Sequence, residues 1–337
     1  KIKELFQKSY LEHSNLADAT RYLANELFSD YGLVILDADD ADLKSVFIPY
    51  IKDEIENQTS FKEVTATLEK LKDYSIQVNP REINLFYIEN NLRERIVFEN
   101  DTYKVNHTNI SFSKEKLLQL VENHPEQFSP NVILRPLYQE VLLPNLCYIG
   151  GGGEIAYWLE LKTTFEAFNC AFPILLLRNS AILVTKKQSE KIEKLQLNWE
   201  QLFLKQEELI NQKVKQIAEI PIDFSAQKTA LKKQFSELYA IANQTDKSFL
   251  GAVKAQETKQ IKGLENLEKR FLKAQKKKYQ SELERIINLQ NELFPNQSLQ
   301  ERQTNFSEFY LEVGITLISN LFDELEPLDN NFTILTL

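Results

Sequence analysis

The arrangement of hydrophobic and polar positions changes once along this chain, near residue 185. Before that point, short apolar runs alternate with segments in which apolar residues recur at helical spacing, and this alternation predicts an α/β fold. After it, apolar residues step by three and four through a background of Lys, Glu and Gln, which predicts long paired helices. We therefore expect an α/β core over residues 1–185, an antiparallel helical coiled-coil arm over 186–295, and a helix and strand over 296–337 that return to the core.

The core region should contain several short strands between helices. The run 31–36 is almost continuously apolar around its glycine, which is typical of a strand buried on both faces. The runs 81–88 and 91–98 predict a hairpin that turns at residues 89–91. Further strands are expected at 103–105, 132–134, 172–177 and 181–184, and helices at 3–29, 43–72, 112–123 and 154–168, with another that starts at Arg135.

The predicted coiled coil begins at Ile192 and continues through Leu195, Trp199 and Leu202. The sequence then predicts a long helix over 249–293, a helix over 304–325 and a final strand over 332–337. Because the apolar stripes of the arm are too narrow for a globular core, its helices must pair with one another or with a second chain. We expect an arm that projects from the core and forms a homodimer.

Four of the eight glycines stand together at Gly150, Gly151, Gly152 and Gly153, directly before a predicted helix that starts at Glu154. Glycine lets the backbone approach a ligand closely and adopt positive φ, so the run predicts a binding loop. The amides at the start of a helix favour an anion, whereas a glutamate in the first turn favours an ammonium group. A mobile hinge is the alternative interpretation of the same residues.

Polar residues also follow other predicted strands, at the ends where α/β proteins gather ligands. Arg178, Asn179 and Ser180 interrupt an apolar run and need polar partners. A ligand phosphate or carboxylate would suit them, and an internal carboxylate such as Glu140 is the alternative. Asp37 ends the first apolar run, where it either contacts a ligand or belongs to an aspartate cluster that caps the next helix.

The segment around the predicted hairpin carries Arg81, Arg93 and Arg95 together with the polar residue Asn84. Arginine binds carboxylates and phosphates through its planar fork of donors, so Arg81 and Asn84 are further candidates for the site. Surface ion pairs with the many nearby glutamates are the simpler interpretation of the arginines.

Composition narrows the classes of function. The net charge of −9 and pI near 5.2 argue against a nucleic-acid partner, because such proteins need a basic surface. No apolar stretch is long enough for a membrane span, and the chain opens on an amphipathic helix rather than a signal sequence. The two cysteines indicate a reducing, cytoplasmic location, and the three histidines share no metal-ligand spacing with them, so no metal site is predicted.

Methionine is absent from the chain, even at position 1. We therefore expect an internal fragment, or a sequence from which residues have been lost.

Several long motifs run through the chain: Tyr31-Gly-Leu-Val-Ile-Leu-Asp37, Pro80-Arg-Glu-Ile-Asn-Leu-Phe-Tyr87, Ser129-Pro-Asn-Val-Ile-Leu-Arg-Pro-Leu-Tyr-Gln-Glu140, Leu143-Pro-Asn-Leu146, Tyr148-Ile-Gly-Gly-Gly-Gly-Glu154, Leu177-Arg-Asn-Ser180 and Leu299-Gln-Glu-Arg302. Together they resemble the family of enzymes that add cysteine in bacillithiol biosynthesis, and the resemblance runs nearly from end to end.

That resemblance implies a Rossmann-like core akin to class I nucleotidyltransferases, with a connective insertion and a coiled-coil arm used for dimerisation. It further implies a ligase that adds cysteine to the amine of glucosaminyl-malate in the last step of bacillithiol biosynthesis, with ATP to activate the carboxyl group. The family carries an N-terminal Thr-Gly-His-Gln motif that is not found in this sequence. We therefore expect the Rossmann-like core to be incomplete at its N-terminus, in which case this polypeptide alone would be inactive.

For such a reaction we expect Arg178 to bind a phosphate or carboxylate, Glu154 an ammonium group and the glycine amides an oxyanion. The side chains expected to orient the sugar and malate are Arg135, Tyr138, Gln139, Glu140 and Asn145, and those expected to line the site are Tyr157 and Trp158. Packing of the helix against the core explains Trp158 equally well.

The central expectation is that the backbone of residues 150–153, Arg135 and Arg178 converge on one cavity. The main alternative is a non-catalytic coiled-coil dimer whose α/β head binds a small anionic ligand. A cysteine ligase that acts on a different amino sugar is the third interpretation.

Overall fold

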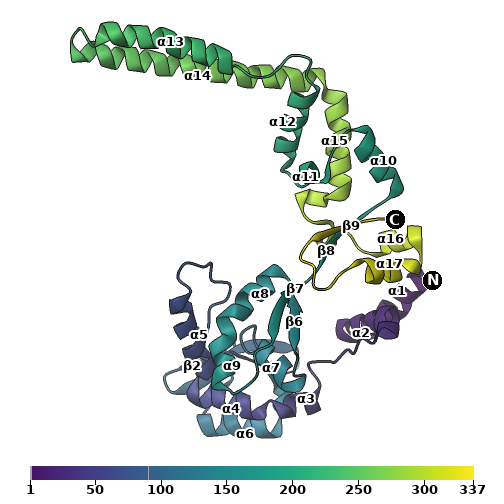
Figure 1. The fold of residues 1–337 in the computed structure, drawn as a ribbon. Coiled ribbons are helices and arrows are strands. Elements are labelled where there is room, and N and C mark those ends of the chain that lie inside the picture. The colour runs from purple at the N-terminus through teal and green to yellow at the C-terminus, as the bar shows by residue number, and fades with distance from the viewer. Residues whose placement is uncertain (1, 90) are drawn as a thin grey trace. The chain divides into compact units, whose positions relative to one another are not determined.

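The computed structural model describes residues 2–89 and 91–337 (Figure 1). It divides into two compact units, which we call the α/β unit, residues 1–179 with 325–331, and the helical unit, residues 180–324 with 332–337. The division falls before the boundary expected at residue 185, because the strand that starts at Ser180 pairs within the helical unit.

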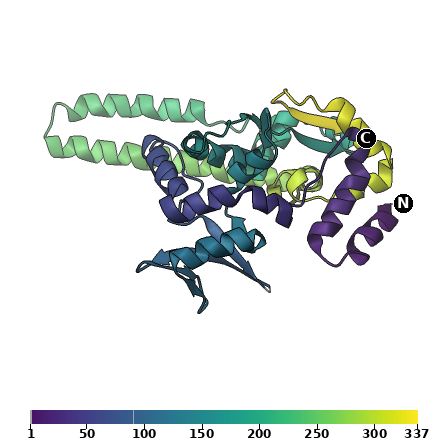
Figure 2. The same cartoon turned by 90° about the horizontal axis from the view of Figure 1, so that it is seen from below.

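The larger sheet of the α/β unit is antiparallel and has the strand order β4-β3-β2-β1-β5. Its strands are β1 (Leu85–Glu89), β2 (Leu92–Glu99), β3 (Thr102–Val105), β4 (Ser111–Phe112) and β5 (Phe128–Pro130). The expected hairpin is confirmed, since β1 and β2 pair with Glu89 opposite Leu92; of its expected turn, Asn90 lies outside the described residues. One face of the sheet is buried, and Figure 2 shows the strands on one side of helix α6 (Lys114–Asn123).

The helices that cover the core of this unit include α3 (Ala41–Val46), α4 (Ile48–Asn57), α5 (Thr59–Lys70) and α7 (Arg135–Leu142). The single helix predicted over 43–72 is therefore three helices. Gln58 explains one of the breaks, because its φ of 54° is left-handed and ends α4. Buried aromatic and aliphatic side chains from these helices and from the antiparallel sheet form one continuous core.

A second, parallel pair of strands carries the glycine run. β6 (Cys147–Gly150) pairs with β7 (Ile174–Leu177), with Gly150 opposite Leu177. The connection between them contains α8 (Gly152–Trp158), a short 3-10 turn and α9 (Lys162–Ala167), so a βαβ unit forms. The helix predicted over 154–168 is therefore present in two main pieces.

Two of the predicted strands are wrong. Residues 31–36 follow the helices α1 (Ile2–Leu11) and α2 (Leu16–Phe28) and form no strand, and Val34 is 77% exposed. Residues 132–134 form a turn in which Asn131 Oδ1 accepts the backbone N–H of Ile133 at 2.8 Å. A short apolar run shows that a segment can be buried in a sheet but does not supply a neighbouring strand, and neither segment has one among the described residues.

The helical unit begins with β8 (Ser180–Val184), which pairs in parallel with β9 (Phe332–Thr336). The predicted final strand thus exists, and its partner is a strand of the helical unit. Around this pair pack the helices α10 (Lys186–Lys194), α11 (Trp199–Leu202), α12 (Gln206–Ile217) and α15 (Gln280–Leu293). Two shorter helices, α16 (Ser307–Val313) and α17 (Thr316–Glu324), occupy the region predicted as one helix over 304–325.

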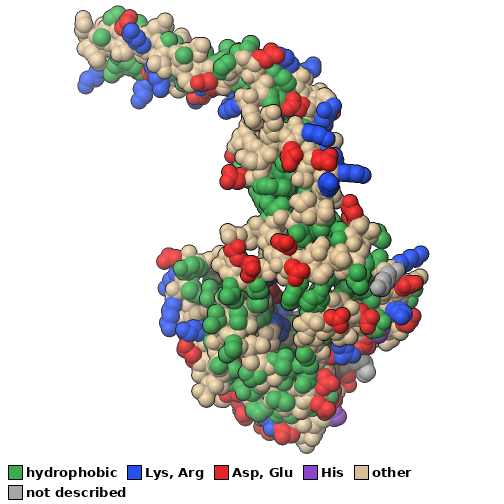
Figure 3. Space-filling view, turned by 45° about the vertical axis from the view of Figure 1, so that its right-hand side comes forward, with side chains coloured by type: hydrophobic (Ala, Val, Ile, Leu, Met, Phe, Trp, Pro, Cys, Tyr) green, Lys and Arg blue, Asp and Glu red, His purple; other side chains and the backbone are tan. Residues whose placement is uncertain are grey.

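The arm is a hairpin of α13 (Ser225–Ala242) and α14 (Lys247–Lys278), seen at the upper left of Figure 1. Phe235, Ala242 and Val253 form the buried contact between the two helices. The helix predicted over 249–293 is interrupted at Tyr279, where α14 ends and α15 follows. Figure 3 shows Lys and Arg side chains along the arm, and hydrophobic side chains gathered on the α/β unit.

No helix in the described ranges is long and apolar enough to cross a membrane.

Candidate functional site

The carboxyl ends of β6 and β7 lie side by side. The backbone N–H of Arg178 donates to the carbonyl of Gly150 at 2.9 Å and extends the ladder by one bond. Helix α8 starts directly after, and Glu154 Oε2 accepts the N–H of Gly151 at 2.9 Å. The helix start is therefore already capped by a carboxylate of the chain itself, which reduces its attraction for an anion.

The four glycines have different environments. None of them has positive φ, since Gly32 and Gly314 are the only glycines of the described chain in that region, so the run does not use glycine's access to left-handed conformations. A Cβ on Gly150 would lie 2.7 Å from Tyr148 Cε1, which no side chain tolerates without movement. A Cβ on Gly153 would meet no atom within 4 Å. Close packing therefore requires a glycine at position 150, whereas position 153 has space for a side chain.

Arg135 occupies the first position of α7 and points toward α8. Its Nη1 donates to Gln139 Oε1 at 3.1 Å, and its Nη2 donates to Tyr157 Oη at 2.7 Å. The Tyr148 hydroxyl is a further hydrogen-bonding neighbour of the guanidinium. Burial lowers the pKa of Arg135, but Tyr157 and Tyr148 outweigh that effect and the pKa is raised overall, so the side chain stays charged.

Tyr148 also contacts Arg135 and was not among the residues predicted for the site. Its ring stacks on Trp158 with centroids 4.0 Å apart and planes 24° apart. Burial raises the pKa of Tyr148, whereas Arg135 lowers it. Because side chains alternate along a strand, Tyr148 and Gly150 lie on the same face of β6, and this spacing was the available signal.

A buried polar network fixes the start of α7. Glu54 Oε1 accepts N–H groups of Asn84 and the hydroxyl of Ser60, and Asn84 Oδ1 accepts from Asn131 at 2.9 Å. Burial raises the pKa of Glu54, while its hydrogen bonds with Ser60 and Asn84 lower it. Asn84, a predicted site candidate, is thus fully buried with internal partners and does not face a ligand.

Other predicted ligand-binding side chains also have internal partners. Glu140 is buried and accepts the backbone N–H and the side-chain amide of Asn145 at 2.9 and 3.0 Å. Tyr138 donates to the carbonyl of Ala38 at 3.0 Å, and burial, with the aspartates of the 37–40 turn, raises the pKa of Tyr138 to about 12. These groups hold loops in place, because their polar atoms are used within the chain.

Trp158 is fully buried among Tyr148, Phe165 and Phe172, as the packing alternative proposed. Asn179 donates to the carbonyls of Glu326 and Asp329 at 2.8 and 3.2 Å. The side chain of Asn179 therefore ties down a segment of the α/β unit.

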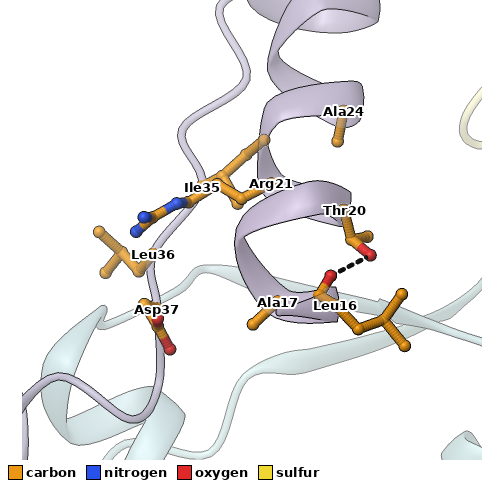
Figure 4. A pocket seen from close by; sticks show the side chains of 8 residues that line it. All are labelled: Leu16, Ala17, Thr20, Arg21, Ala24, Ile35, Leu36 and Asp37. Atoms are coloured by element: carbon orange, nitrogen blue, oxygen red, sulfur yellow. Dashed lines mark hydrogen bonds between the residues drawn. The ribbon is translucent and has the colours of Figure 1, made fainter. Parts of the chain in front are cut away.

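Asp37 belongs to the turn before α3. Its Oδ1 accepts the N–H of Asp39 at 3.0 Å, and Asp40 caps α3, so the capping interpretation of the aspartate cluster is confirmed. Asp37 also lines a pocket of about 430 Å³ between α2 and the following extended segment (Figure 4). The lining is mostly apolar, and Arg21, its one cationic member, is paired with Asp18 at 2.9 Å.

Arg93 and Arg81 form contacts other than the expected surface ion pairs. Arg93 lies over the ring of Phe86 with 3.9 Å between the guanidinium carbon and the ring centroid. Arg81 is exposed and uses its backbone N–H and carbonyl to hold Asn84. Ser180 starts β8 and so belongs to the helical unit.

The structure brings together Arg135, Tyr148, Glu154 and Tyr157 around the end of β6, and it places the backbone of Arg178 beside Gly150. We call the four side chains the Arg135 cluster. In the described residues no group of three or more His, Cys, Asp or Glu side chains is arranged to hold a metal ion.

Comparison with known proteins supports the motif-based resemblance. Residues 1–179 match the model of the N-terminal Rossmann-like domain of bacillithiol biosynthesis BshC, and residues 181–337 match that of its C-terminal coiled-coil domain. This chain belongs to the BshC family. The expected combination of a Rossmann-like α/β domain with a coiled-coil domain is thereby confirmed.

Individual BshC relatives agree with this assignment. A protein of Flavobacterium johnsoniae named "Putative cysteine ligase BshC" is 65% identical over 336 residues, which are 100% of this chain and 64% of the relative. Proteins of the same name from Christiangramia forsetii and Lysinibacillus sphaericus are 60% and 27% identical, over 99% and 93% of this chain and 63% and 60% of the relatives. The chain thus spans less than two thirds of the length of these relatives.

Proposed function

We propose that this chain serves a cysteine ligase that joins the carboxyl group of cysteine to the amine of glucosaminyl-malate, in the cytoplasm and in the last step of bacillithiol biosynthesis. Membership in the BshC family and the names of its relatives support a ligase. The observation in the structure that supports a site is the Arg135 cluster, in which Arg135 of α7 meets Tyr157 of the βαβ unit near the end of β6. Ligands of open α/β sheets bind outside the carboxyl ends of strands.

Amide formation requires loss of a carboxyl oxygen from cysteine and attack of the acceptor nitrogen on the carboxyl carbon, with release of a proton. ATP would supply the phosphate that turns the oxygen into a leaving group. The exposed Gly152 and Gly153 offer room for such a phosphate, and Arg178 follows the adjoining strand end. Glu154 opposes an anion at the helix start, so we assign the phosphate to the Arg178 side of the loop and the ammonium group to Glu154.

We also propose a homodimer through the arm. Near the turn between α13 and α14 the side chains of Leu238, Ile241 and Phe249 are exposed, and exposed apolar side chains that cluster favour association. Sedimentation of the whole chain would test this, and a monomer at micromolar concentration would contradict it.

Mass spectrometry tests the proposed reaction. The chain is incubated with cysteine, ATP and glucosaminyl-malate, and the expected product has the mass of the two joined substrates less one water. Glucosamine without malate serves as the comparison acceptor and tests the interpretation with a different amino sugar. Binding of ATP or malate without any amide product from either acceptor would favour the non-catalytic head instead.

A further inference from the structure

The Arg135 cluster combines opposite charges with two phenols in a small region of the α/β unit. Arg135 and Tyr157 are joined directly at 2.7 Å, and Glu154 lies three residues before Tyr157 on α8, so the two side chains are neighbours on the helix. Tyr148 Cε1 and Glu154 Cβ both lie within 3.3 Å of the point that a Cβ on Gly150 would occupy. The cation, the carboxylate and both phenols therefore surround the end of β6.

Arg135 has hydrogen-bonding capacity beyond its internal contacts. A guanidinium has five N–H donors, and the contacts with Gln139, Tyr157 and Tyr148 account for three of them. No carboxylate of the described α/β unit pairs with Arg135; its neighbours are an amide oxygen and phenols. A half-buried cation held only by neutral groups is suited to an anionic ligand that approaches its remaining donors.

Glu154 supplies the opposite charge. One of its oxygens caps Gly151 at 2.9 Å, and its other oxygen accepts no hydrogen bond from a described residue. The side chain is exposed, so a bound cation can reach it. A single ligand that satisfies both charges must carry an anion and a cation close together.

We propose that the Arg135 cluster is a subsite for a free α-amino acid, with the α-carboxylate on Arg135 and the α-ammonium on Glu154. The inference rests on the proposed function, in which cysteine is the amino acid. Malate and ATP fit this subsite less well, because both are anions without an ammonium group and would lie next to Glu154.

Tyr148 is assigned as a positioning residue. Its ring is held on Trp158, and its hydroxyl faces Arg135, so the ring ties the guanidinium to the core. The missing side chain of Gly150 leaves the space that this ring needs. A ligand that draws on Arg135 should therefore also change the surroundings of Trp158.

The test compares three ligands by calorimetry on the whole chain: cysteine, 3-mercaptopropionate, which lacks the ammonium group, and cysteamine, which lacks the carboxylate. Wild type should bind cysteine about tenfold more tightly or better than either analogue. Arg135→Gln should weaken cysteine and 3-mercaptopropionate about ten- to hundredfold and leave cysteamine unchanged. Glu154→Gln should weaken cysteine and cysteamine but not 3-mercaptopropionate.

Each of the two variants should lose binding of a different analogue and keep binding of the other. A variant that failed to fold would lose binding of both analogues, so the two causes can be distinguished. The amide oxygen that Glu154→Gln introduces can still accept the N–H of Gly151, so α8 keeps its cap. Arg135→Lys is the second variant at that position, since it keeps the charge and loses the fork. Arg93→Gln and Glu166→Gln, both at exposed positions outside the cluster, are the matched controls and should bind all three ligands as wild type does.

A Trp199→Phe background leaves Trp158 as the single tryptophan. Cysteine should then change the fluorescence of Trp158, and Tyr148→Phe should reduce that change.

Three results would overturn the subsite: no cysteine binding by wild type, cysteine binding by the Arg135→Gln and Glu154→Gln variants as tight as by wild type, or Arg135-dependent binding of malate but not of cysteine. These outcomes are distinct from failure of the proposed function. Product formation that is unaffected by Arg135→Gln would contradict the subsite but not the proposed ligase activity. Cysteine binding that depends on both Arg135 and Glu154, without product from any acceptor, would contradict the proposed ligase activity but not the subsite.

Discussion

The molecule contains two parallel strand pairs of similar length with different surroundings. In β8–β9 of the helical unit, Ile182 and Val184 are fully buried under the surrounding helices. In β6–β7 of the α/β unit, Ile174 is 67% exposed and Ile149 is 56% exposed. The contrast indicates that the first pair stabilises its unit, whereas the second presents strand ends and polar groups to the surface.

The polar groups of the two pairs show the same difference. Gln300 donates to the carbonyl of Leu183 and accepts its N–H, both at 2.9 Å, so the amide closes a backbone ladder. At the end of β6, Arg135 bonds to Tyr157 and Glu154 accepts from Gly151, and no ion pair between Arg135 and Glu154 is found among the described residues. Polar groups whose partners lie within the chain support structure, whereas charged groups with donors and acceptors left over are open to water or to a ligand.

The largest effect should come from the buried pair. Ile182→Ala leaves a cavity under the helices of the helical unit and should lower the free energy of unfolding by about 2–5 kcal/mol. Ile174→Ala in the exposed pair should lower it by less than about 1 kcal/mol, because that side chain is already largely in water. Urea denaturation measures both. Equal losses would mean that the two strand pairs do not differ in the way their exposure suggests.

The second effect tests the buried support of α7. Glu54→Gln places an amide where Glu54 Oε2 accepts the N–H of Ser60, and should cost about 1–3 kcal/mol of unfolding free energy. Burial raises the folded-state pKa of Glu54 above its ordinary value of 4.5, so the stability that this group contributes is full below pH 4.5 and is lost as pH rises through the raised value. The cost of Glu54→Gln should therefore shrink as the pH rises above 4.5.

Urea midpoints of both proteins at several pH values measure this trend. Ser45→Ala, at an exposed position on α3, is the control and should show a cost that does not vary with pH. A cost that grows with pH would show that the folded state favours the charged carboxylate, contrary to the burial argument.

The sequence predicted those features that follow from local pattern. The hairpin of β1 and β2 and the helix α6 appear where periodicity placed them, because amphipathic spacing determines which face of an element is buried. The helix predicted over 249–293 is divided at Tyr279 into α14 and α15. The strands predicted at 31–36 and 132–134 are absent, because strand formation also requires a neighbouring strand at the right register.

The candidate site could be predicted only in part, because the sequence does not show which polar groups are paired within the chain. Composition selected Arg135 and Tyr157, which do meet, but also Glu140 and Asn84, whose polar atoms are used inside the chain. Only the fold shows which polar residues have internal partners. Tyr148 was not selected, and no strand was predicted over residues 147–150, so the place of its ring beside Gly150 and on Trp158 became visible only in the fold.

The third prediction separates the glycines at the end of β6. Gly150→Ala would force Tyr148 off Trp158, and the strain should cost about 1–3 kcal/mol. Gly153→Ala has open space and a helical position, and should raise the free energy of unfolding by about 0.5–1 kcal/mol. Thermal unfolding, read through Trp158 fluorescence in the Trp199→Phe background, measures both. The steric argument fails if Gly150→Ala is as stable as Gly153→Ala.

The smallest effect isolates the hydroxyl of Tyr148. Tyr148→Phe keeps the ring that stacks on Trp158 and removes the group that faces Arg135, so unfolding free energy should fall by only about 0.5–1.5 kcal/mol. The fluorescence of unliganded Trp158 should be unchanged, whereas Gly150→Ala should alter it, because the first change spares the stack and the second displaces it. If the two substitutions changed the fluorescence equally, the position of the Tyr148 ring on Trp158 would depend on the bond of Tyr148 to Arg135. The polar contacts of the Arg135 cluster would then determine how the aromatic core packs.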